Sequence, residues 1–417
     1  MNKDEFYTEL KELETRFENM NPEFELTLRD PEQGVEGYIV VWNTGISVGG
    51  PLERCGKGGT RITPDVSLDE VKMLARRMAL KNAAAGLPLG GAKSGIKAAP
   101  DAEGFEDIYK RFAVLSKPSL FEHGGPFGGF GFDIGARPIH PQWVCDALES
   151  TQSFTGKPVE MGGTDYDKEG IAGLGVATSA KTALEEGGKS ADGATFAVQG
   201  IGAMGGAVIK YFTEYGGLLS AVSDPRLGGT WYFDDAGAPE EFLNLLLAVD
   251  IDGCKTYLDG SSYKNTEDNN DALYHDVDVV FPCAVHDVLT KYNTHKVQAK
   301  YLSEGANGPC TIEAHEILYN NGTTVIPDFI ANSGGIIAAF VELTSKATIE
   351  DNIRSRTKAT EAKITTINKI TENVQQLMRL IKELDVEPTH AGMYIALRNI
   401  FGLHDAPEHC ALQQSAL

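Results

Sequence analysis

Two lysines, Lys81 and Lys93, lie in a sequence pattern that predicts acid–base chemistry. The helix that carries Lys81 is expected to begin with a capping box, in which Ser67 and Glu70 satisfy each other's backbone donors. A lysine on an inward-facing stripe is costly unless an anionic group meets it, so Lys81 is expected to face a site. The apolar residues that recur at helical spacing on its face are Val71, Leu74, Ala75, Met78 and Ala79.

Glycines and a proline end this helix and lead to the second lysine. Gly86 and Pro88 stop the helix, and Gly90-Gly91 is expected to let the backbone turn close to whatever Lys93 faces. Both lysines would then lie in one site from which water is excluded, where burial lowers a lysine pKa into the range useful for proton transfer. The pattern alone leaves open a second interpretation, in which the first is a snorkelling surface lysine and the second an ordinary loop lysine.

Residues 195–224 predict a dinucleotide site. An apolar strand over 195–199 runs directly into a glycine turn, a helix with apolar residues at helical spacing and a second strand over 218–222. This order is typical of the Rossmann unit, whose glycines let a pyrophosphate approach the helix N-terminus. A helix–strand turn with chance glycines is the alternative. The predicted cofactor-binding residues of the turn are Gly200, Gly202, Ala203, Met204 and Gly205.

The acid at the end of the second strand bears on which dinucleotide binds. Asp224 lies about 20 residues beyond the glycines, where an acid would bind an unphosphorylated ribose. Arg226, two residues on, could instead meet a 2′-phosphate. We expect NADP slightly in preference to NAD, with dual use open.

Composition excludes several classes of protein. The 417 residues are too many for one core, and a net charge of −22 disfavours nucleic-acid partners. No run of eighteen apolar residues predicts a membrane span, and the N-terminus lacks the apolar core of a signal peptide. The six cysteines form no CxxC pair, so we expect reduced thiols, a cytoplasmic location and no metal.

Further motifs extend the pattern over most of the chain, from about Trp42 to Glu342. Together with the lysine pair, Asp133 and the Rossmann unit, they resemble the glutamate/leucine/phenylalanine/valine dehydrogenase family, nearest its glutamate dehydrogenase branch. The resemblance implies oxidative deamination of an L-amino acid to a 2-oxo acid and ammonia, with the reverse reductive amination. The motifs are the lysine loop Leu87–Gly95 and the downstream segments Glu304–Pro309 and Ile326–Gly335.

The resemblance also implies residue roles. Lys93 would be the catalytic lysine, Asp133 the proton-transferring carboxylate and Lys81 the group that binds the substrate α-carboxylate. Lys57, next to Gly58, matches the lysine that contacts the side-chain carboxylate in glutamate-using members.

The same resemblance implies cofactor contacts and shows two departures from the family pattern. Asn307 and Asn332 match positions near the nicotinamide and its ribose. Ala339 replaces a serine that binds the distal carboxylate in glutamate-specific relatives, and Ala172 replaces a usual threonine. Lys57 and Ala339 thus favour different substrates; glutamate is preferred, with an apolar L-amino acid as the alternative.

We therefore expect an α/β protein of two domains with the active-site cleft between them. Residues 1–175 plus 336–417 would form a substrate and oligomerisation domain, and residues 176–335 a doubly wound, Rossmann-like NAD(P)-binding domain. The resemblance implies a homo-oligomer, expected to be a homohexamer. A catalytically weak sensor of dinucleotide or amino acid is the competing class, although the lysine pair and Asp133 argue against it.

Overall fold

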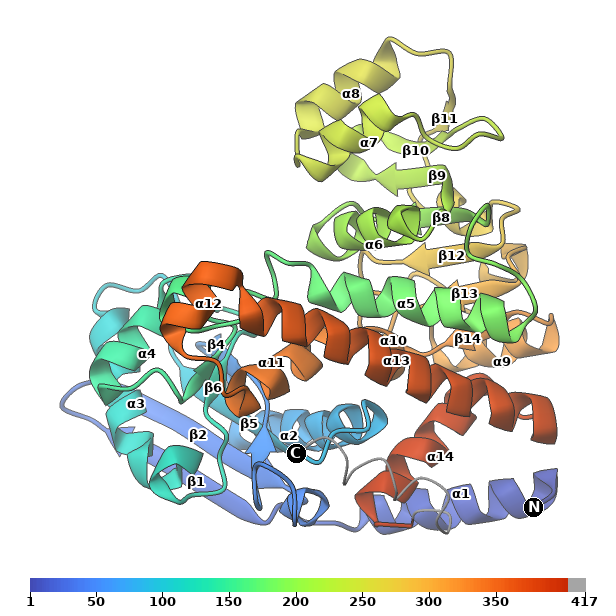
Figure 1. The fold of residues 1–417 in the computed structure, drawn as a ribbon. Coiled ribbons are helices and arrows are strands. Elements are labelled where there is room, and N and C mark those ends of the chain that lie inside the picture. The colour runs from blue at the N-terminus through green and yellow to red at the C-terminus, as the bar shows by residue number, and fades with distance from the viewer. Residues whose placement is uncertain (404–417) are drawn as a thin grey trace.

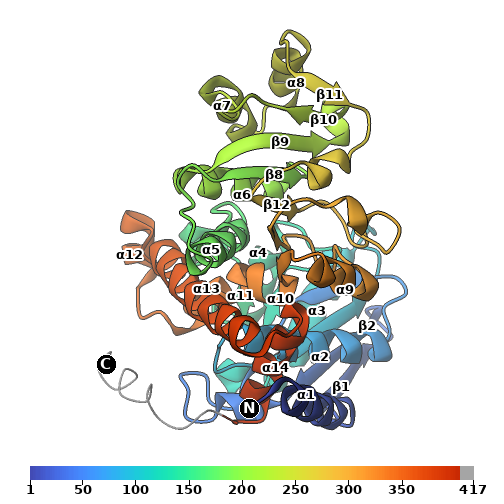
Figure 2. The same cartoon turned by 90° about the vertical axis from the view of Figure 1, so that its right-hand side faces the viewer.

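The computed structural model describes residues 1–403 as two α/β layers, each built on its own sheet (Figure 1). Residues 404–417, which include Cys410 and the end of the predicted substrate domain, lie outside the described residues. Helices α5 (Ile171–Glu186) and α13 (Thr357–Leu384) run side by side between the layers (Figures 1 and 2). No helix of the described part is both long enough and apolar enough to cross a membrane.

The first layer contains a five-stranded sheet with the order β1-β2-β5-β3, in which β4 also pairs with β5. β1, β2 and β5 are antiparallel neighbours, whereas β3 and β4 run parallel to β5. The strand that carries Lys93 is therefore central. The strands are β1 (Phe24–Asp30), β2 (Val35–Trp42), β3 (Gly56–Lys57), β4 (Thr60–Thr63) and β5 (Gly90–Lys97).

Side chains of β2 point alternately to the two faces of this sheet, and both faces are buried. Val40 packs in the cluster of α2 (Leu68–Ala84), and its neighbours Ile39 and Val41 pack in the cluster of α3 (Phe105–Ser116) on the other face. α14 (Pro388–Ile400) returns to pack against α2 and α1 (Lys3–Glu18). The remaining elements of this layer are α4 (His140–Leu148), β6 (Phe130–Gly131) and β7 (Phe154–Thr155).

The second layer is a seven-stranded sheet with the order β11-β10-β9-β8-β12-β13-β14. Its centre, from β9 to β14, is parallel, and β10 and β11 add an antiparallel edge. The predicted strand over 195–199 is confirmed. The strands are β8 (Thr195–Gln199), β9 (Leu218–Asp224), β10 (Gly229–Tyr232), β11 (Lys264–Thr266), β12 (Val279–Pro282), β13 (Tyr301–Ser303) and β14 (Thr324–Ile326).

Helices cover both faces of this sheet, as a doubly wound fold requires. Phe196 and Val198 pack in the cluster that contains α5 and α6 (Ala203–Glu214), and Ala197 packs in the cluster that contains α9 (Ile312–Asn320). The other helices of this layer are α7 (Glu240–Leu247), α8 (Ile251–Asp259) and α10 (Asp328–Ala331).

The connections between the layers differ from the sequence expectation in detail. The predicted domain boundaries at 175/176 and 335/336 fall inside continuous helices, α5 and α11 (Gly334–Thr344), so these boundaries stay predictions. After α11, α12 (Ile349–Ser355) ends at Arg356, which adopts the left-handed conformation, and α13 begins directly after it.

Candidate active site

Lys93 lies on strand β5 and not after a turn, so the turn expected at Gly90-Gly91 is wrong. Glycines on this strand instead allow close packing of the neighbouring helix. A Cβ on Gly91 would lie 2.3 Å from the Ala79 nitrogen, and one on Gly95 would lie 2.7 Å from a Val71 methyl group. These missing side chains let α2 lie directly on β5, on either side of Lys93. The predicted helix with its Ser67 cap is confirmed, but the Glu70 carboxylate pairs with Arg61 instead of closing a capping box.

Lys93 meets the predicted carboxylate. Its Nζ lies 3.0 Å from Oδ2 of Asp133, and Arg61 Nε donates to the same oxygen at 2.8 Å. Arg61 in turn donates to Glu70 at 2.6 Å, so four charged groups alternate in sign. Neither contact with Asp133 uses Oδ1. The sequence analysis found the first pair but missed Arg61, because nothing local marks a strand residue 72 positions from its partner.

Burial adjusts the proton affinities of this pair. Burial lowers the pKa of Lys93 and the nearby Arg61 cation acts in the same direction, while Asp133 opposes them. For Asp133, burial alone would raise the pKa, but Lys93 and Arg61 outweigh it and hold the pKa below its usual range. The arrangement suits a lysine that loses its proton readily beside a carboxylate that stays ionised.

Lys81 reaches across to the second layer. Its Nζ donates to Oδ1 of Asn332 at 2.6 Å, and Nδ2 of Asn332 donates to Oδ1 of Asn307 at 3.0 Å. Burial lowers the pKa of Lys81, opposed by the Asp328 carboxylate. Lys81, Asn332 and Asn307, which come from separate sequence motifs, are therefore connected by hydrogen bonds.

Lys57 and Gly58 are placed differently from the prediction. Lys57 is buried, and its Nζ donates to the carbonyls of Gly58, Gly129 and Phe130 at 3.1, 2.8 and 2.6 Å. An ammonium group has three donors, so in this conformation none is left for a substrate carboxylate. Burial lowers the pKa of Lys57 to about 7. A Cβ on Gly58 would lie 1.8 Å from the Ala92 carbonyl oxygen, so this glycine allows close strand packing.

The helix that carries Ala339 contributes a buried ion pair one turn further on. Ala339 is 4% exposed and supplies no polar atom to its surroundings. Glu342 pairs with Lys157 and accepts hydrogen bonds from the amides of Gly156 and Thr164. Neither member of this pair was singled out by the sequence analysis.

Loops at the carboxyl ends of the parallel strands build the dinucleotide site. After β8, Gly200 adopts a φ of +88°, and a Cβ on Gly205 would lie 1.7 Å from the Gly200 carbonyl oxygen, so the turn requires glycine. A Cβ on Gly202 would meet nothing within 4 Å, and no side chain caps α6. An uncapped helix N-terminus with open space beside Gly202 suits the pyrophosphate-binding role predicted for Ala203 and Met204.

Asp224 and Arg226, the two residues predicted to contact the ribose or its 2′-phosphate, form an ion pair with each other. Arg226 donates to both oxygens of Asp224, from Nε at 2.8 Å and from Nη2 at 3.0 Å, and the Ile201 amide donates to Asp224 at 2.9 Å. Burial alone would raise the Asp224 pKa, but these donors hold it below its usual range. The Arg226 side chain remains 48% exposed beside the glycine turn.

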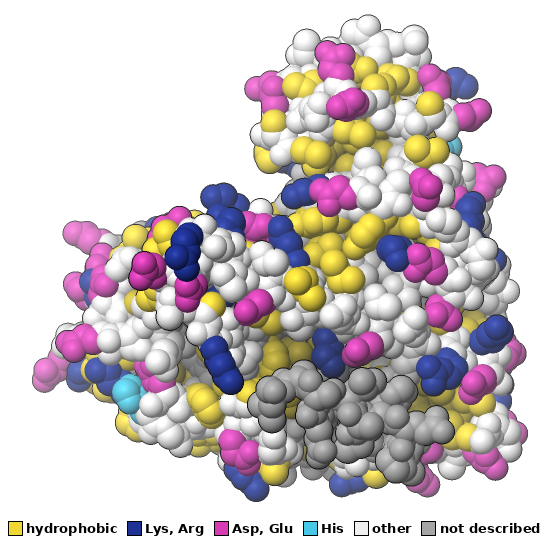
Figure 3. All heavy atoms as spheres, in the orientation of Figure 1, with side chains coloured by type: hydrophobic (Ala, Val, Ile, Leu, Met, Phe, Trp, Pro, Cys, Tyr) yellow, Lys and Arg dark blue, Asp and Glu magenta, His cyan; other side chains and the backbone are white. Residues whose placement is uncertain are grey.

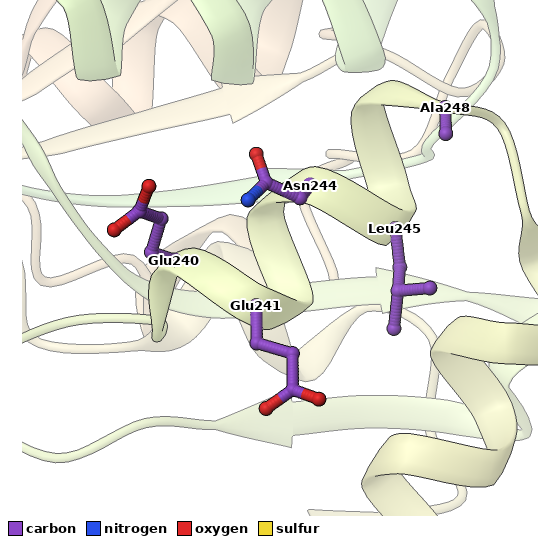
Figure 4. Close-up of a pocket in the computed structure, with 5 residues that line it drawn as sticks. All are labelled: Glu240, Glu241, Asn244, Leu245 and Ala248. Carbon is purple, nitrogen blue, oxygen red and sulfur yellow. The ribbon is translucent and has the colours of Figure 1, made fainter.

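Two surface hollows lie outside this constellation. One runs along α7, where Glu240, Glu241, Asn244, Leu245 and Ala248 line it (Figure 4). It contains none of the predicted site residues. A second, more enclosed hollow has the Lys157–Glu342 pair in its lining, together with Cys55 and Gly128 beside Lys57.

The parallel sheet with a glycine turn at its strand ends, facing a buried lysine–carboxylate cluster, defines a dinucleotide-dependent oxidoreductase. Two family models match: Glutamate/Leucine/Phenylalanine/Valine dehydrogenase over residues 162–406, and Glu/Leu/Phe/Val dehydrogenase, dimerisation domain, over residues 22–117. The chain belongs to this family and is an NAD(P)-dependent amino-acid dehydrogenase.

Individual relatives agree with the family assignment. The chain is 36% identical to a glutamate dehydrogenase of Aeropyrum pernix, over 69% of this chain and 68% of the relative. It is 34% identical to an NADP-specific glutamate dehydrogenase of Saccharolobus shibatae, over 69% and 67%. A hetero-hexameric glutamate dehydrogenase from Thermus thermophilus shares the fold, with a TM-score of 0.68 and 22% identity over 98% of this chain and 99% of that one.

Proposed function

We propose that this dehydrogenase interconverts L-glutamate and 2-oxoglutarate with NADP. Both relatives at 34–36% identity are named glutamate dehydrogenase, which supports glutamate as the substrate. The second is named NADP-specific, which supports NADP as the cofactor. The half-exposed Arg226 supports the 2′-phosphate, because it both neutralises Asp224 and offers a guanidinium at the ribose end of the site.

In the proposed mechanism a dinucleotide held at the glycine turn after β8 would supply the hydride acceptor or donor, and this chain's residues position the substrate and move protons. Lys81, oriented by Asn332, binds the substrate α-carboxylate. Neutral Lys93 removes a proton from the water that attacks the substrate iminium carbon, and its ammonium form then stabilises the developing oxyanion. Asp133, ionised at rest, relays the proton from the Lys93 ammonium to the departing ammonia. With the dinucleotide as hydride acceptor, amino acid and water would thus give the 2-oxo acid and ammonium.

The single observation that carries this mechanism is the 3.0 Å contact between buried Lys93 and Asp133. We expect Lys93→Ala to lower turnover to less than a few per cent of the original rate, because no other described side chain occupies the position of this base. NADPH binding, followed by fluorescence, should be retained. Retention of more than a few per cent of the activity with an intact fold would overturn the proposed role.

The geometry also favours a second candidate substrate, an apolar L-amino acid. The Lys57 donors are on backbone carbonyls and Ala339 offers no hydroxyl, so neither residue contacts a distal carboxylate in this conformation. Initial rates of reductive amination with 2-oxoglutarate, 4-methyl-2-oxopentanoate and phenylpyruvate, each with NADPH and with NADH, distinguish the two. Preference for 2-oxoglutarate with NADPH supports the proposal. Preference for an apolar oxo acid would replace it.

We also propose self-association, to a homohexamer, in the cytoplasm. The structurally similar Thermus thermophilus protein is hetero-hexameric, and this chain exposes isoleucines on the substrate layer and on the C-terminal helices: Ile134, Ile139, Ile349, Ile353, Ile364 and Ile367. Acidic and basic side chains are interspersed across the face shown in Figure 3. Light scattering coupled to gel filtration tests the state: a mass of six chains supports it, and a monomer contradicts it.

A further inference from the structure

A carboxylate, a thiol and an imidazole come together behind the cofactor-side motif. Glu304 follows β13, Cys310 precedes α9 and His315 lies near the start of α9. Their potential ligand atoms all lie within 4.8 Å of one another. Glu304 and Cys310 are buried, and His315 is partly exposed. A search for CxxC pairs does not find this group, because it contains a single cysteine with a carboxylate and an imidazole, all within residues 304–315.

The contacts within the cluster centre on the two carboxylate oxygens of Glu304. Glu304 Oε1 lies 2.8 Å from Nε2 of His315, and Glu304 Oε2 accepts a hydrogen bond from the Asp328 amide at 2.9 Å. The Cys310 thiol adjoins Glu304, and burial together with this carboxylate raises the pKa of the thiol. Only His315, with 14% of its side chain exposed, gives a route from solvent.

The surroundings of the cluster are negative. Burial alone would lower the pKa of His315, but the carboxylates of Glu304, Glu387 and Asp328 outweigh burial and raise it. Three carboxylates thus surround one imidazole and one thiol, and of the neighbouring cations only Lys81 acts on Asp328. A divalent cation would compensate this charge better than a single proton does.

We propose that Glu304, Cys310 and His315 form a binding site for Zn²⁺, with water as the fourth ligand. The oxygen, nitrogen and sulfur ligands are those that zinc takes in proteins, and three protein ligands plus water is a recurrent arrangement. Tetrahedral zinc sets oxygen and nitrogen ligands about 3.3 Å apart, so Glu304 and His315 need to separate only slightly. Binding releases the thiol proton and the proton shared by His315 and Glu304 to solvent.

This site is independent of the proposed dehydrogenase function. None of its three side chains is among those that hold Lys93 or Asp133. Glu304 begins the Glu304–Pro309 loop, which carries Asn307, and a zinc ion would tie that loop to the first turn of α9. Its test therefore needs no turnover.

The experiment uses the full chain carrying Cys410→Ser, which removes the one cysteine outside the described residues. Co²⁺ is the spectroscopic probe, since a cobalt–thiolate bond gives a charge-transfer band in the near ultraviolet. Zn²⁺ affinity is measured by competition with a chromophoric chelator. We expect one Co²⁺ per chain with a thiolate band, displaced by Zn²⁺.

Four variants decide which residues bind the metal. Cys310→Ser should abolish the thiolate band, and His315→Gln should weaken Zn²⁺ binding more than about tenfold while the fold, followed by circular dichroism, is retained. Cys254→Ser, a buried thiol on α8, and Cys283→Ser, near Gly305, should leave the band unchanged. Absence of a band, its persistence in Cys310→Ser, or unchanged affinity in His315→Gln would overturn the proposal.

Discussion

Arg61 acts on the proton affinity of Lys93, the residue for which we propose the catalytic role. It shares the Asp133 oxygen with Lys93 and is itself held by Glu70. The Arg61 cation lowers the Lys93 pKa and the Glu70 carboxylate raises it. Arg61 and Glu70 are therefore positioning residues with opposite electrostatic effects on the same lysine.

This opposition gives a pH-dependent prediction. Oxidative deamination needs neutral Lys93, so kcat should rise with pH through the lowered Lys93 pKa. Arg61→Gln removes a nearby positive charge and leaves Asp133 to Lys93 alone, so the rising limb should move to higher pH by about one unit or more. Glu70→Gln should move it the opposite way. Arg29→Gln, an exposed arginine, is the control. A shift of the same sign in both variants would contradict the assigned roles.

Ala339 tests the substrate at the same scale. A serine hydroxyl there should add a hydrogen bond to a distal carboxylate worth about 1.5–3 kcal/mol. Ala339→Ser should therefore lower KM for 2-oxoglutarate by about tenfold or more, with little change for 4-methyl-2-oxopentanoate. Ala338→Ser, a buried neighbour in a different apolar cluster, is the matched control. An unchanged KM would mean that the distal carboxylate does not lie near Ala339.

At the scale of elements, the contact between α2 and β5 determines the distance between the two lysines. Lys81 is on the helix and Lys93 on the strand, and Gly91 and Gly95 allow the helix to lie on the strand. In the proposed mechanism, the residue that binds the substrate carboxylate and the residue that deprotonates the attacking water therefore lie on two elements that share one interface. Activity should therefore be more sensitive than stability to changes at this interface.

Gly91→Ala tests this coupling. The new Cβ would lie 2.3 Å from the Ala79 nitrogen and 2.4 Å from the Ala75 carbonyl oxygen, and backbone atoms cannot rotate away. We expect a loss of about 1–3 kcal/mol in the free energy of unfolding, together with a large fall in kcat. Gly45→Ala, where nothing lies within 4 Å, should change stability by less than about 0.5 kcal/mol. Wild-type kcat in Gly91→Ala would show that the spacing is not critical.

Much of the element structure could be predicted from the sequence, because local periodicity and turn chemistry act over a few residues. The strand at 195–199 and the helix with the Ser67 cap are both confirmed. Gly90-Gly91 was expected to form a turn but lies in β5, where these glycines allow the close approach of α2 and of neighbouring backbone rather than a change of direction. That use of glycine depends on α2, which only packing brings to the strand.

At the scale of the whole molecule, the Lys157–Glu342 pair joins the chain before α5 to α11, one of the segments that return from the second layer. Both side chains are almost fully buried, and two backbone amides also depend on the Glu342 carboxylate. The same α11 begins against α5, where a Cβ on Gly334 would lie 2.2 Å from the Ile171 carbonyl oxygen. The pair thus fixes the returning helix α11 to the first layer, beside β7.

Glu342→Gln should therefore destabilise the protein strongly. It leaves the Lys157 charge buried and unpaired, which costs about 3–5 kcal/mol. The double variant Lys157→Met with Glu342→Leu should recover part of the loss, because it removes both charges. Lys189→Gln breaks a more exposed pair with Asp278 and should cost less than about 1 kcal/mol. Urea unfolding measures the stability of all three variants against the original protein; equal losses for Glu342→Gln and Lys189→Gln would contradict this account.

The sequence by itself determined the two-layer α/β fold, the glycine turn at the end of β8, the inward-facing Lys81 and the motifs that place Lys93 and Asp133 in one site. Each of these depends on residue order within one segment, on turn chemistry, or on several motifs that occur in a fixed order.

Only the tertiary structure decided which polar groups become partners. It tied Lys57 to three carbonyls, added Arg61 to the Lys93–Asp133 pair and brought Glu304 to Cys310 and His315. The physical reason is that a buried donor or acceptor must be satisfied by whatever group packing brings within hydrogen-bond reach. Lys57 and Arg61 each have a partner 72 positions away in the chain, where residue spacing carries no information about distance. The partners of Glu304 lie nearby, but on a loop and helix whose packing no spacing rule predicts.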